Sequence, residues 1–219
     1  MKLVRDFERR LERLVDGMAG KVFRGKLHPV ELAARLVREA DLSIEEGPAG
    51  PTAANAYTLR LNPRDLDTEV PSGLVHELEE VLESTAADRG WRLEGPVHVS
   101  LEPTEGISTG SVECRVAQSP GPRQAWAVLT TGRSTKHAVR HNRCVIGRGE
   151  ASDIIVADPG VSRIHALLWR EGGDAWVVDL GSANGTNVNG NSSNGPLLLS
   201  PGSVVTFGPV AFTFHLGAR

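Results

Sequence analysis

From residue 124 to residue 219 the chain consists of short apolar or alternating segments, separated by clusters of glycine, proline, asparagine and aspartate. Segments of this length are typical of β-strands, and the three-to-four-residue period of a helix is absent from them. The segments are Trp126–Leu129, Val139–Ile146, Ile154–Val156, His165–Trp169, Trp176–Leu180, Val204–Phe207 and Val210–Leu216. Their regular punctuation predicts an all-β sandwich over residues 125–219.

Residues 1–117 show a different pattern, in which helical and strand-like segments are mixed. The predicted helices cover residues 3–18, 29–40 and 72–89, and the predicted strands cover residues 57–61, 97–101 and 111–116. We therefore expect an α+β interaction domain with about three helices on a small mixed sheet. Proline and glycine at residues 118–124 predict a short linker between the two domains.

Composition excludes several classes of protein. The chain has a net charge of −3 with 40% hydrophobic residues, and no apolar stretch approaches the roughly 18 residues that span a bilayer. Because the first residues also lack a signal-peptide core, we expect a cytoplasmic protein without membrane insertion, which leaves room for peripheral association through partners. Cys114 and Cys144 have no metal-ligand neighbours, so we expect thiols, with no metal and no cofactor.

Three short polar segments stand between the strand-like stretches of the C-terminal half. They are Gly147-Arg148, Ser162-Arg163-Ile164-His165 and Asn184-Gly185-Thr186. The Arg148 guanidinium offers a planar fork of donors to an anion, and the Ser162 hydroxyl adds another donor. The Asn184 amide carries a donor and an acceptor, which suits a peptide main chain. Each segment alone is a common turn, but their order on a β-sandwich predicts three loops that converge on a phosphate.

These segments resemble the forkhead-associated (FHA) domain, which reads phosphothreonine peptides. The resemblance implies that Arg148 and Ser162 bind the phosphate, that Arg163 is a second phosphate or loop contact, and that Asn184 binds the backbone beside the phosphothreonine. It also implies that four further residues support the binding loops: Gly147, His165, Gly185 and Thr186. Several family members have a hydroxyl or basic residue where this chain has Ala183, so the flanking-residue preference is left open.

The N-terminal half resembles the domain of unknown function that precedes the FHA module in actinobacterial FHA proteins. The resemblance rests on residues 7–12, 22–25, 28–33 and 95–99. It implies a place in Ser/Thr-kinase signalling, connected to cell-wall synthesis and division. The expected partners are phosphothreonine-containing proteins, either a kinase or its substrates.

Two other readings use residues of the same chain. Ser162, His165 and Asp179 could be arranged as a hydrolase triad, but the chain lacks a nucleophile elbow, and we expect no enzyme activity. Gly17-Met18-Ala19-Gly20 resembles the GxxG loop of a KH domain, which gives the alternative of a nucleic-acid-binding protein recruited through its FHA module. The acidic residues that follow weigh against nucleic acid as a partner.

The sequence therefore predicts a non-catalytic signalling adaptor that docks on phosphothreonine proteins. A further hypothesis concerns hydroxyl residues before the linker, which could themselves be phosphorylated and bind the FHA face. These residues are Thr104, Ser108, Thr109 and Ser111.

Overall fold

The computed structural model describes residues 27–66, 72–132 and 135–217. The chain divides into two compact units. Unit 1 takes in the described residues up to Glu45, together with Thr52–Ala86 and Leu93–Gly121, and unit 2 takes in Glu46–Pro51, Ala87–Arg92 and the residues from Pro122 onward. The limits predicted from the sequence, a domain at 1–117 and a domain at 125–219 around a linker at 118–124, stay our proposal. The helix predicted at 3–18 and the Gly17–Gly20 segment lie outside the described residues.

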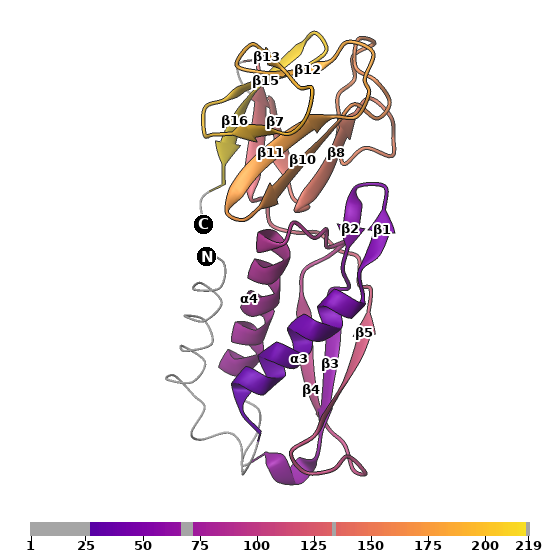
Figure 1. The fold of residues 1–219 in the computed structure, drawn as a ribbon, viewed down its shortest axis with the longest axis vertical. Helices are drawn as coiled ribbons and strands as arrows, with labels where there is room; N and C mark the ends of the chain where they lie inside the picture. Colours follow the sequence, from indigo (N-terminus) through magenta and orange to yellow (C-terminus); the bar gives the residue numbers. More distant parts are fainter. Residues whose placement is uncertain (1–26, 67–71, 133–134, 218–219) are drawn as a thin grey trace. The chain divides into compact units, whose positions relative to one another are not determined.

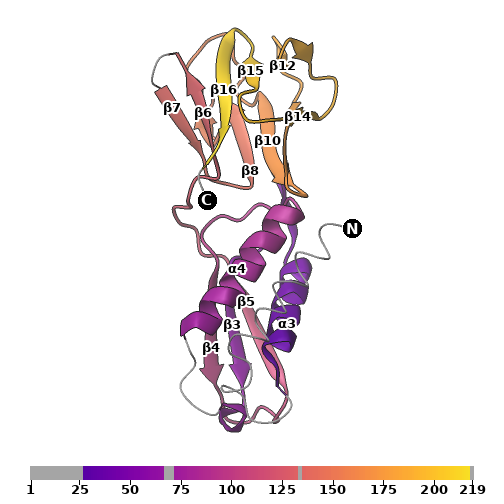
Figure 2. The same cartoon turned by 90° about the vertical axis from the view of Figure 1, so that its left-hand side faces the viewer.

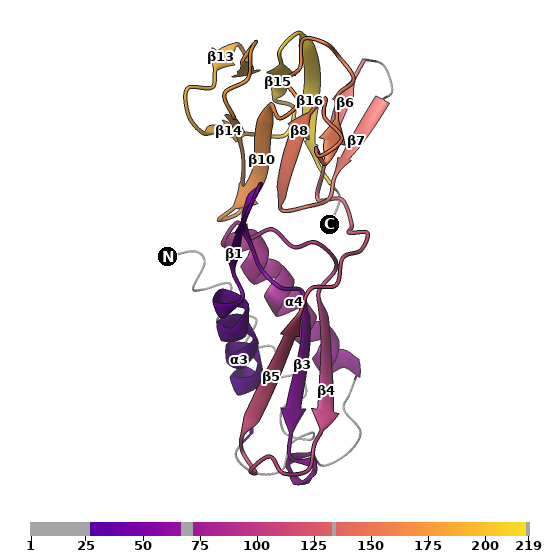
Figure 3. The same ribbon diagram turned by 90° about the vertical axis from the view of Figure 1, so that its right-hand side faces the viewer.

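Unit 1 has two helices and a three-stranded mixed sheet among its described residues, and the helices lie against one face of the sheet (Figures 1 and 3). The central strand β3 runs parallel to β4 and antiparallel to β5. The elements are α3 (Pro29–Leu42), β3 (Ala56–Leu61), the 3-10 turn η1 (Pro63–Asp65), α4 (Ser72–Asp88), β4 (His98–Pro103) and β5 (Val112–Ala117). This confirms the predicted α+β class.

Local sequence explains why these elements form. Pro29 occupies the first turn of α3, where its missing N–H is no loss, and the Glu31 carboxylate accepts a hydrogen bond from the His28 N–H. In β3 every second side chain is buried, because Tyr57 and Leu59 belong to the face that the helices cover. The hairpin of β1 (Glu45–Gly47) and β2 (Gly50–Thr52) was not predicted, since three-residue strands with glycine and proline carry no alternating pattern.

Unit 2 is a β-sandwich of two sheets that face each other (Figure 2). One sheet has the order β14-β11-β10-β8-β9, and the other has the order β13-β12-β15-β16-β6-β7. The strands are β6 (Ala127–Thr131), β7 (Thr135–Val139), β8 (Arg143–Gly147), β9 (Ile154–Ile155), β10 (Ala166–Glu171), β11 (Asp174–Asp179), β12 (Thr186–Val188), β13 (Asn191–Ser192), β14 (Leu197–Leu199), β15 (Val204–Phe207) and β16 (Val210–Leu216). The predicted sandwich is confirmed.

The sandwich core explains why the alternating segments became strands. Phe207 of β15 and both Phe212 and Phe214 of β16 are at most 2% exposed and fill the space between the sheets. On β10 the side chains of both faces are buried. Leu168 enters the core, while Trp169 packs on the outer face together with Ala49.

Two predicted details of the sandwich are wrong. Residues 139–146 are not one strand, because β7 and β8 belong to different sheets and Asn142 lies in the turn between them. The fully buried Asn142 accepts hydrogen bonds from the backbone and side chain of Arg170, which fix the turn against β10. Strands β12 to β14 were also missed, because each is only two or three residues long. Strands β12 and β13 also contain asparagine and serine, which disfavour strands, whereas β14 consists of three leucines, too short a stretch to show a period.

Candidate functional site

Hydrogen bonds from backbone and side-chain groups bring the three predicted loops of unit 2 together. The Arg148 N–H, just after β8, donates to the Ser162 carbonyl at 2.9 Å. The Ala183 N–H donates to the Ser162 Oγ at 3.0 Å, and the Asn184 amide donates to the Gly160 carbonyl at 2.8 Å. Loops that begin at residues 148, 160 and 180 therefore form one surface at one end of the sandwich.

Arg148 and Ser162 present complementary donors on this surface. The Arg148 side chain is exposed, while Ser162 is half-buried. The Ala183 N–H uses only a lone pair of the Ser162 Oγ, so this bond leaves the hydroxyl hydrogen for donation to a ligand oxygen. The guanidinium supplies charge and the hydroxyl supplies a neutral donor beside it.

His165 ties two of the loops together from below the surface. Its ring is fully buried, and its Nδ1 accepts the Ser162 N–H at 3.0 Å. A backbone N–H can only donate, so the proton of the neutral ring sits on Nε2, which donates to the Gly185 carbonyl at 3.0 Å. The ring also meets Phe207 edge-on, at a centroid distance of 5.8 Å.

This arrangement differs from the hydrolase triad that the sequence also allowed. Backbone groups engage both ring nitrogens of His165, and the Ser162 atom on Nδ1 is its backbone nitrogen rather than its hydroxyl. The nearest Asp179 oxygen lies 3.8 Å from His165 Nε2. A general base must reach the nucleophile's proton, and here His165 is a support for loops.

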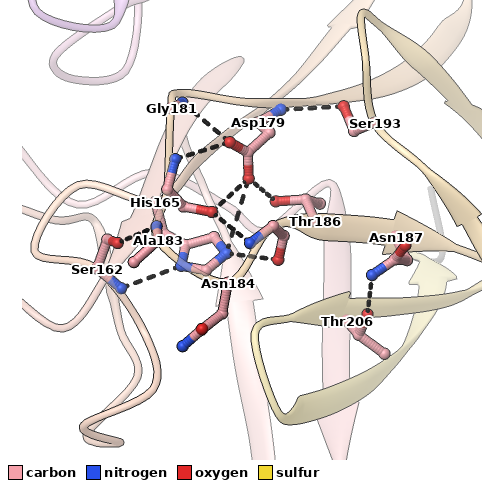
Figure 4. A network of polar contacts seen from close by, with 12 residues as sticks. Ser162, His165, Asp179, Gly181, Ala183, Asn184, Thr186, Asn187, Ser193 and Thr206 are labelled. Carbon is pink, nitrogen blue, oxygen red and sulfur yellow. Dashed lines mark hydrogen bonds and ion pairs between the residues drawn. The ribbon is translucent and has the colours of Figure 1, made fainter.

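Asp179, at the end of β11, organises the third loop, as Figure 4 shows. Its Oδ1 accepts the backbone N–H groups of Gly181 and Ser182, and its Oδ2 accepts the hydroxyls of Ser182 at 2.6 Å and Thr186 at 2.7 Å. The Ser182 Oγ in turn accepts the Gly185 N–H. Sequence reasoning treated Asp179 only as a triad acid. The signal that could have found its role is an aspartate two residues before a glycine, which favours a side-chain-to-backbone turn.

These hydrogen bonds set the ionisation of Asp179. Burial raises the pKa of the Asp179 carboxyl, but hydrogen bonds from Ser182, Thr186 and the Gly181 backbone outweigh burial and hold the pKa below the ordinary value of 3.8. The carboxylate is therefore charged across the physiological range, and the loop depends on it.

We predict that Asp179→Asn lowers the free energy of unfolding by about 1–3 kcal/mol at neutral pH, because an amide nitrogen cannot accept the hydrogen bonds. A folded-state pKa below 3.8 gives stability that is present above pH 3.8 and is lost as the pH falls through the folded pKa. Urea denaturation at neutral pH and near pH 3 measures this difference.

The gap between wild type and Asp179→Asn should be largest at neutral pH and shrink below pH 3.8. Asp174→Asn, which removes an exposed carboxylate from the same strand, is the matched control and should change little. A gap of equal size at both pH values would contradict the role given to the charge.

The glycines of the site have two distinct tasks. Gly185 has a φ of +75°, a region that non-glycine residues seldom adopt. Gly147 has no positive φ, and a different constraint applies to it. A Cβ at Gly147 would lie 2.2 Å from the Arg163 carbonyl oxygen, and glycine is required because two backbones approach closely.

Arg163, Asn184 and Ser152 are further polar side chains of these loops. Arg163 and Asn184 are both exposed, and the amide of Asn184 points away from the Asp179 network (Figure 4). Ser152, which sequence reasoning missed, is 7% exposed and donates its hydroxyl to the Arg163 carbonyl at 3.0 Å. No pattern in the sequence marks Ser152, because its partner is a backbone oxygen eleven residues away.

Metal ligands, thiols and apolar helices are the other features that could define a site in the described part of the chain. Among the described residues, no group of three or more histidine, cysteine, aspartate or glutamate side chains could hold a metal ion. Cys114 and Cys144 are free thiols, and burial raises the pKa of both, that of Cys114 to about 11. No helix within the described ranges is both long and apolar enough to cross a bilayer.

Two protein families match this chain. The family described as "FhaA, N-terminal domain" matches residues 4–115, and the family described as "FHA domain" matches residues 144–208. The chain belongs to the FhaA N-terminal domain family and carries an FHA domain. The resemblance expected for each half of the sequence is confirmed.

Relatives of this FHA protein come from actinobacteria. The glycogen accumulation regulator GarA of Mycolicibacterium smegmatis is 41% identical over 115 residues, which are 52% of this chain and 65% of GarA. The oxoglutarate dehydrogenase inhibitor of Corynebacterium diphtheriae is 44% identical over 73 residues, which are 33% of this chain and 50% of that protein. FhaA of Mycobacterium tuberculosis is 35% identical over 80 residues, 36% of this chain and 15% of FhaA. The chain thus spans half the length of the corynebacterial relative and less of FhaA.

Solved structures of FHA domains also match. The FhaA FHA domain complexed with the intracellular domain of Rv3910 is 30% identical, with 41% of this chain and 97% of that chain covered and a TM-score of 0.37. Mycobacterium tuberculosis EmbR in complex with a low affinity phosphopeptide is 29% identical, with 44% of this chain and 26% of that chain covered and a TM-score of 0.41.

The structure explains why Gly95 and Pro96 stand in the 95–99 segment of unit 1, which the sequence did not show. Asn55 is fully buried, and its Nδ2 donates to the carbonyls of Pro96 and Ser119, both at 2.8 Å. A Cβ at Gly95 would lie 2.1 Å from the Ser119 carbonyl oxygen. The Gly95-Pro96 pair therefore leaves room for a hydrogen-bonded crossing of two chain segments within unit 1.

Proposed function

We propose that this protein is a non-catalytic signalling adaptor that binds phosphothreonine-containing proteins through its FHA domain. One observation carries the proposal. The Arg148 guanidinium, the Ser162 hydroxyl and the Asn184 amide are presented on three loops that hydrogen bonds tie to one another. Donors held in this way lose little freedom when a ligand binds, which favours affinity.

A phosphothreonine fits these donors by charge and by number of acceptors. Its phosphate carries about −1.5 to −2 charges and three strong acceptor oxygens at neutral pH. In our proposal Arg148 pairs with two of those oxygens through its planar fork, and Ser162 donates its hydroxyl to the phosphate. Arg163, exposed on the same loop as Ser162, is a second phosphate or loop contact.

Asn184 supplies the contact to the peptide itself. One hydrogen of its amide is used on the Gly160 carbonyl, which leaves a carbonyl oxygen and a second N–H for the backbone beside the phosphothreonine. Ala183 adds no polar side chain beside this contact. The preference for flanking residues must therefore come from other parts of the surface.

The relatives support a regulatory setting for this activity. Their names describe a regulator of glycogen accumulation and an inhibitor of oxoglutarate dehydrogenase rather than a reaction. We propose that the present protein acts in the cytoplasm, downstream of Ser/Thr protein kinases, with a kinase or its substrates as partners. A link to cell-wall synthesis and division remains part of this proposal.

Calorimetric titration of the full chain with peptide pools tests the function. The pools share one degenerate sequence and carry phosphothreonine, phosphoserine or unmodified threonine at the fixed position. We expect the phosphothreonine pool to bind. We expect the phosphoserine pool to bind at least about tenfold more weakly than the phosphothreonine pool, since one methyl group in an apolar pocket is worth about 1–3 kcal/mol.

Either of two results would overturn the proposal. Equal binding of the phosphorylated and unmodified pools would show that the phosphate is not recognised. No heat from the phosphothreonine pool at millimolar peptide would show that these donors do not form a phosphopeptide site.

A further inference from the structure

The loop that carries Arg148 is held at its other end by a residue from outside the segment that matches the FHA family. Arg92 belongs to the Ala87–Arg92 segment of unit 2, in the same compact unit as this loop. Its guanidinium meets the Asp153 carboxylate with two hydrogen bonds of 2.8 Å, one to each oxygen. The two side chains are 12% and 17% exposed, although the residue Asp153 as a whole is exposed.

Each member of this pair also holds a backbone group of β8. Arg92 Nη1 donates to the Arg143 carbonyl at 2.7 Å, and Asp153 Oδ2 accepts the Val145 N–H at 2.7 Å. Strand β9 begins only at Ile154, so the carboxylate takes the place of a strand beside Val145. The His141 ring lies near the same carboxylate, with its Nε2 at 3.8 Å from Asp153 Oδ1. The pair therefore fastens the end of the loop to the edge of the sheet.

Hydrogen bonds within the loop connect Asp153 to the residues that we propose bind the phosphate. Ser152 donates its N–H to the Gly149 carbonyl at 3.1 Å and its hydroxyl to the Arg163 carbonyl at 3.0 Å. The Gly149 N–H donates to the same Arg163 carbonyl. Because Ser152, the neighbour of Asp153, is bonded to both Gly149 and Arg163, a shift of Asp153 is passed on to the backbone next to Arg148 and to Arg163.

We propose that Arg92 and Asp153 are positioning residues for the phosphothreonine site, which couple the Ala87–Arg92 segment to the affinity of the FHA domain. This inference rests on the proposed function of Arg148. Arg92 is separated from Arg148 by the loop and acts through Asp153. A fork of donors is needed, since one cation has to bridge both carboxylate oxygens and the Arg143 carbonyl together.

Two substitutions, Asp153→Asn and Arg92→Lys, distinguish positioning from a simple effect of charge on binding. Asp153 is a negative charge near an anion site, so Asp153→Asn should strengthen binding of a phosphopeptide if only Coulomb energy mattered. Arg92→Lys keeps the positive charge and should have no effect on that account. Positioning predicts that both variants weaken binding, because both release the end of the loop.

The test is calorimetric titration of the full chain with one phosphothreonine peptide, chosen as the tightest sequence of the phosphothreonine pool. We expect Arg92→Lys and Asp153→Asn each to weaken binding by about threefold to thirtyfold, the range of mutations that act through a coupled network. The double variant should bind the peptide no more weakly than the weaker-binding single variant, because both changes break the same Arg92–Asp153 pair.

Two matched controls separate positioning from charge and from general damage. Glu150→Gln removes a carboxylate from the same loop, and Arg89→Lys changes an arginine of the same segment that stacks on Trp91. Both should bind within about twofold of wild type. The NMR signals of the Arg148 amide and its side-chain Nε–H should shift in Arg92→Lys and Asp153→Asn, and stay in place in the controls.

The outcomes distinguish this inference from the proposed function. Tighter binding by Asp153→Asn and Glu150→Gln alike, or additive losses in the double variant, would overturn the positioning role while leaving the phosphopeptide site intact. No binding by the wild type would overturn the proposed function and the coupling with it. Unchanged Arg148 signals beside a loss of affinity would also contradict positioning.

Discussion

Replacing Arg148 by alanine is expected to weaken binding of a phosphothreonine peptide by about a hundredfold. The Arg148 guanidinium can donate two charge-assisted hydrogen bonds to the phosphate. Such a bond is worth about 1.5–3 kcal/mol, and we take the lower end because the Arg148 side chain is exposed. A total near 3 kcal/mol corresponds to the stated factor. Calorimetry at fixed salt measures the change, since exposed charges are screened by ions.

Arg148→Lys separates the geometry of the fork from its charge. An ammonium keeps the charge but cannot bind two phosphate oxygens in one plane, so we expect about tenfold weaker binding than wild type. The free energy of unfolding should stay within about 0.5 kcal/mol in both variants, because the side chain is exposed.

Lys136→Ala is the control for net charge. It removes one positive charge from β7, in the other sheet, where the side chain is also exposed. Binding by this variant should stay within about twofold of wild type. Equal losses in Lys136→Ala and Arg148→Ala would mean that the peptide responds to overall charge rather than to the site.

Gly147→Ala is expected to damage both stability and binding. The added methyl group would lie 2.2 Å from the Arg163 carbonyl oxygen and 2.8 Å from the Ser152 Oγ. A backbone oxygen cannot rotate away as a side chain can, so the Arg163 loop has to move from β8. We expect a loss of about 1–3 kcal/mol in the free energy of unfolding, as for other overpacked sites.

The same movement should separate the groups that we propose bind the phosphate. Arg148 and Ser162 are joined through the Arg148 N–H and the Ser162 carbonyl, next to the forced contact. We therefore expect peptide binding by Gly147→Ala to fall about tenfold or more at a temperature where the variant is still folded. Urea denaturation and calorimetry on the same preparation give both quantities.

Gly195→Ala serves as the control for the loss of a glycine. No atom lies within 4 Å of a Cβ at Gly195, and its φ is not positive. Stability and binding should both remain close to wild type. If Gly147→Ala behaved like Gly195→Ala, the close approach of the two loops would not be a requirement of the site.

The sequence by itself was sufficient for the class of both units and for the three polar segments that the fold brings together. Period-two alternation marks a strand with one buried face, as in β3 and β16, and it depends only on neighbouring residues. The helix at Pro29–Leu42 was also predictable, since its first-turn proline and its apolar period are local features. The family motifs marked Arg148, Ser162 and Asn184 because their side-chain chemistry is visible in the residue names.

Tertiary structure alone decided how those side chains are held. Asp179 and Ser152 bind backbone groups of loops, and Arg92 reaches a carboxylate 61 positions further along the chain. The need for glycine at Gly147 likewise comes from a carbonyl that lies in another loop. Every residue has the same backbone N–H and carbonyl groups, so a sequence does not show which of them will meet. Such contacts exist only after distant segments have packed together.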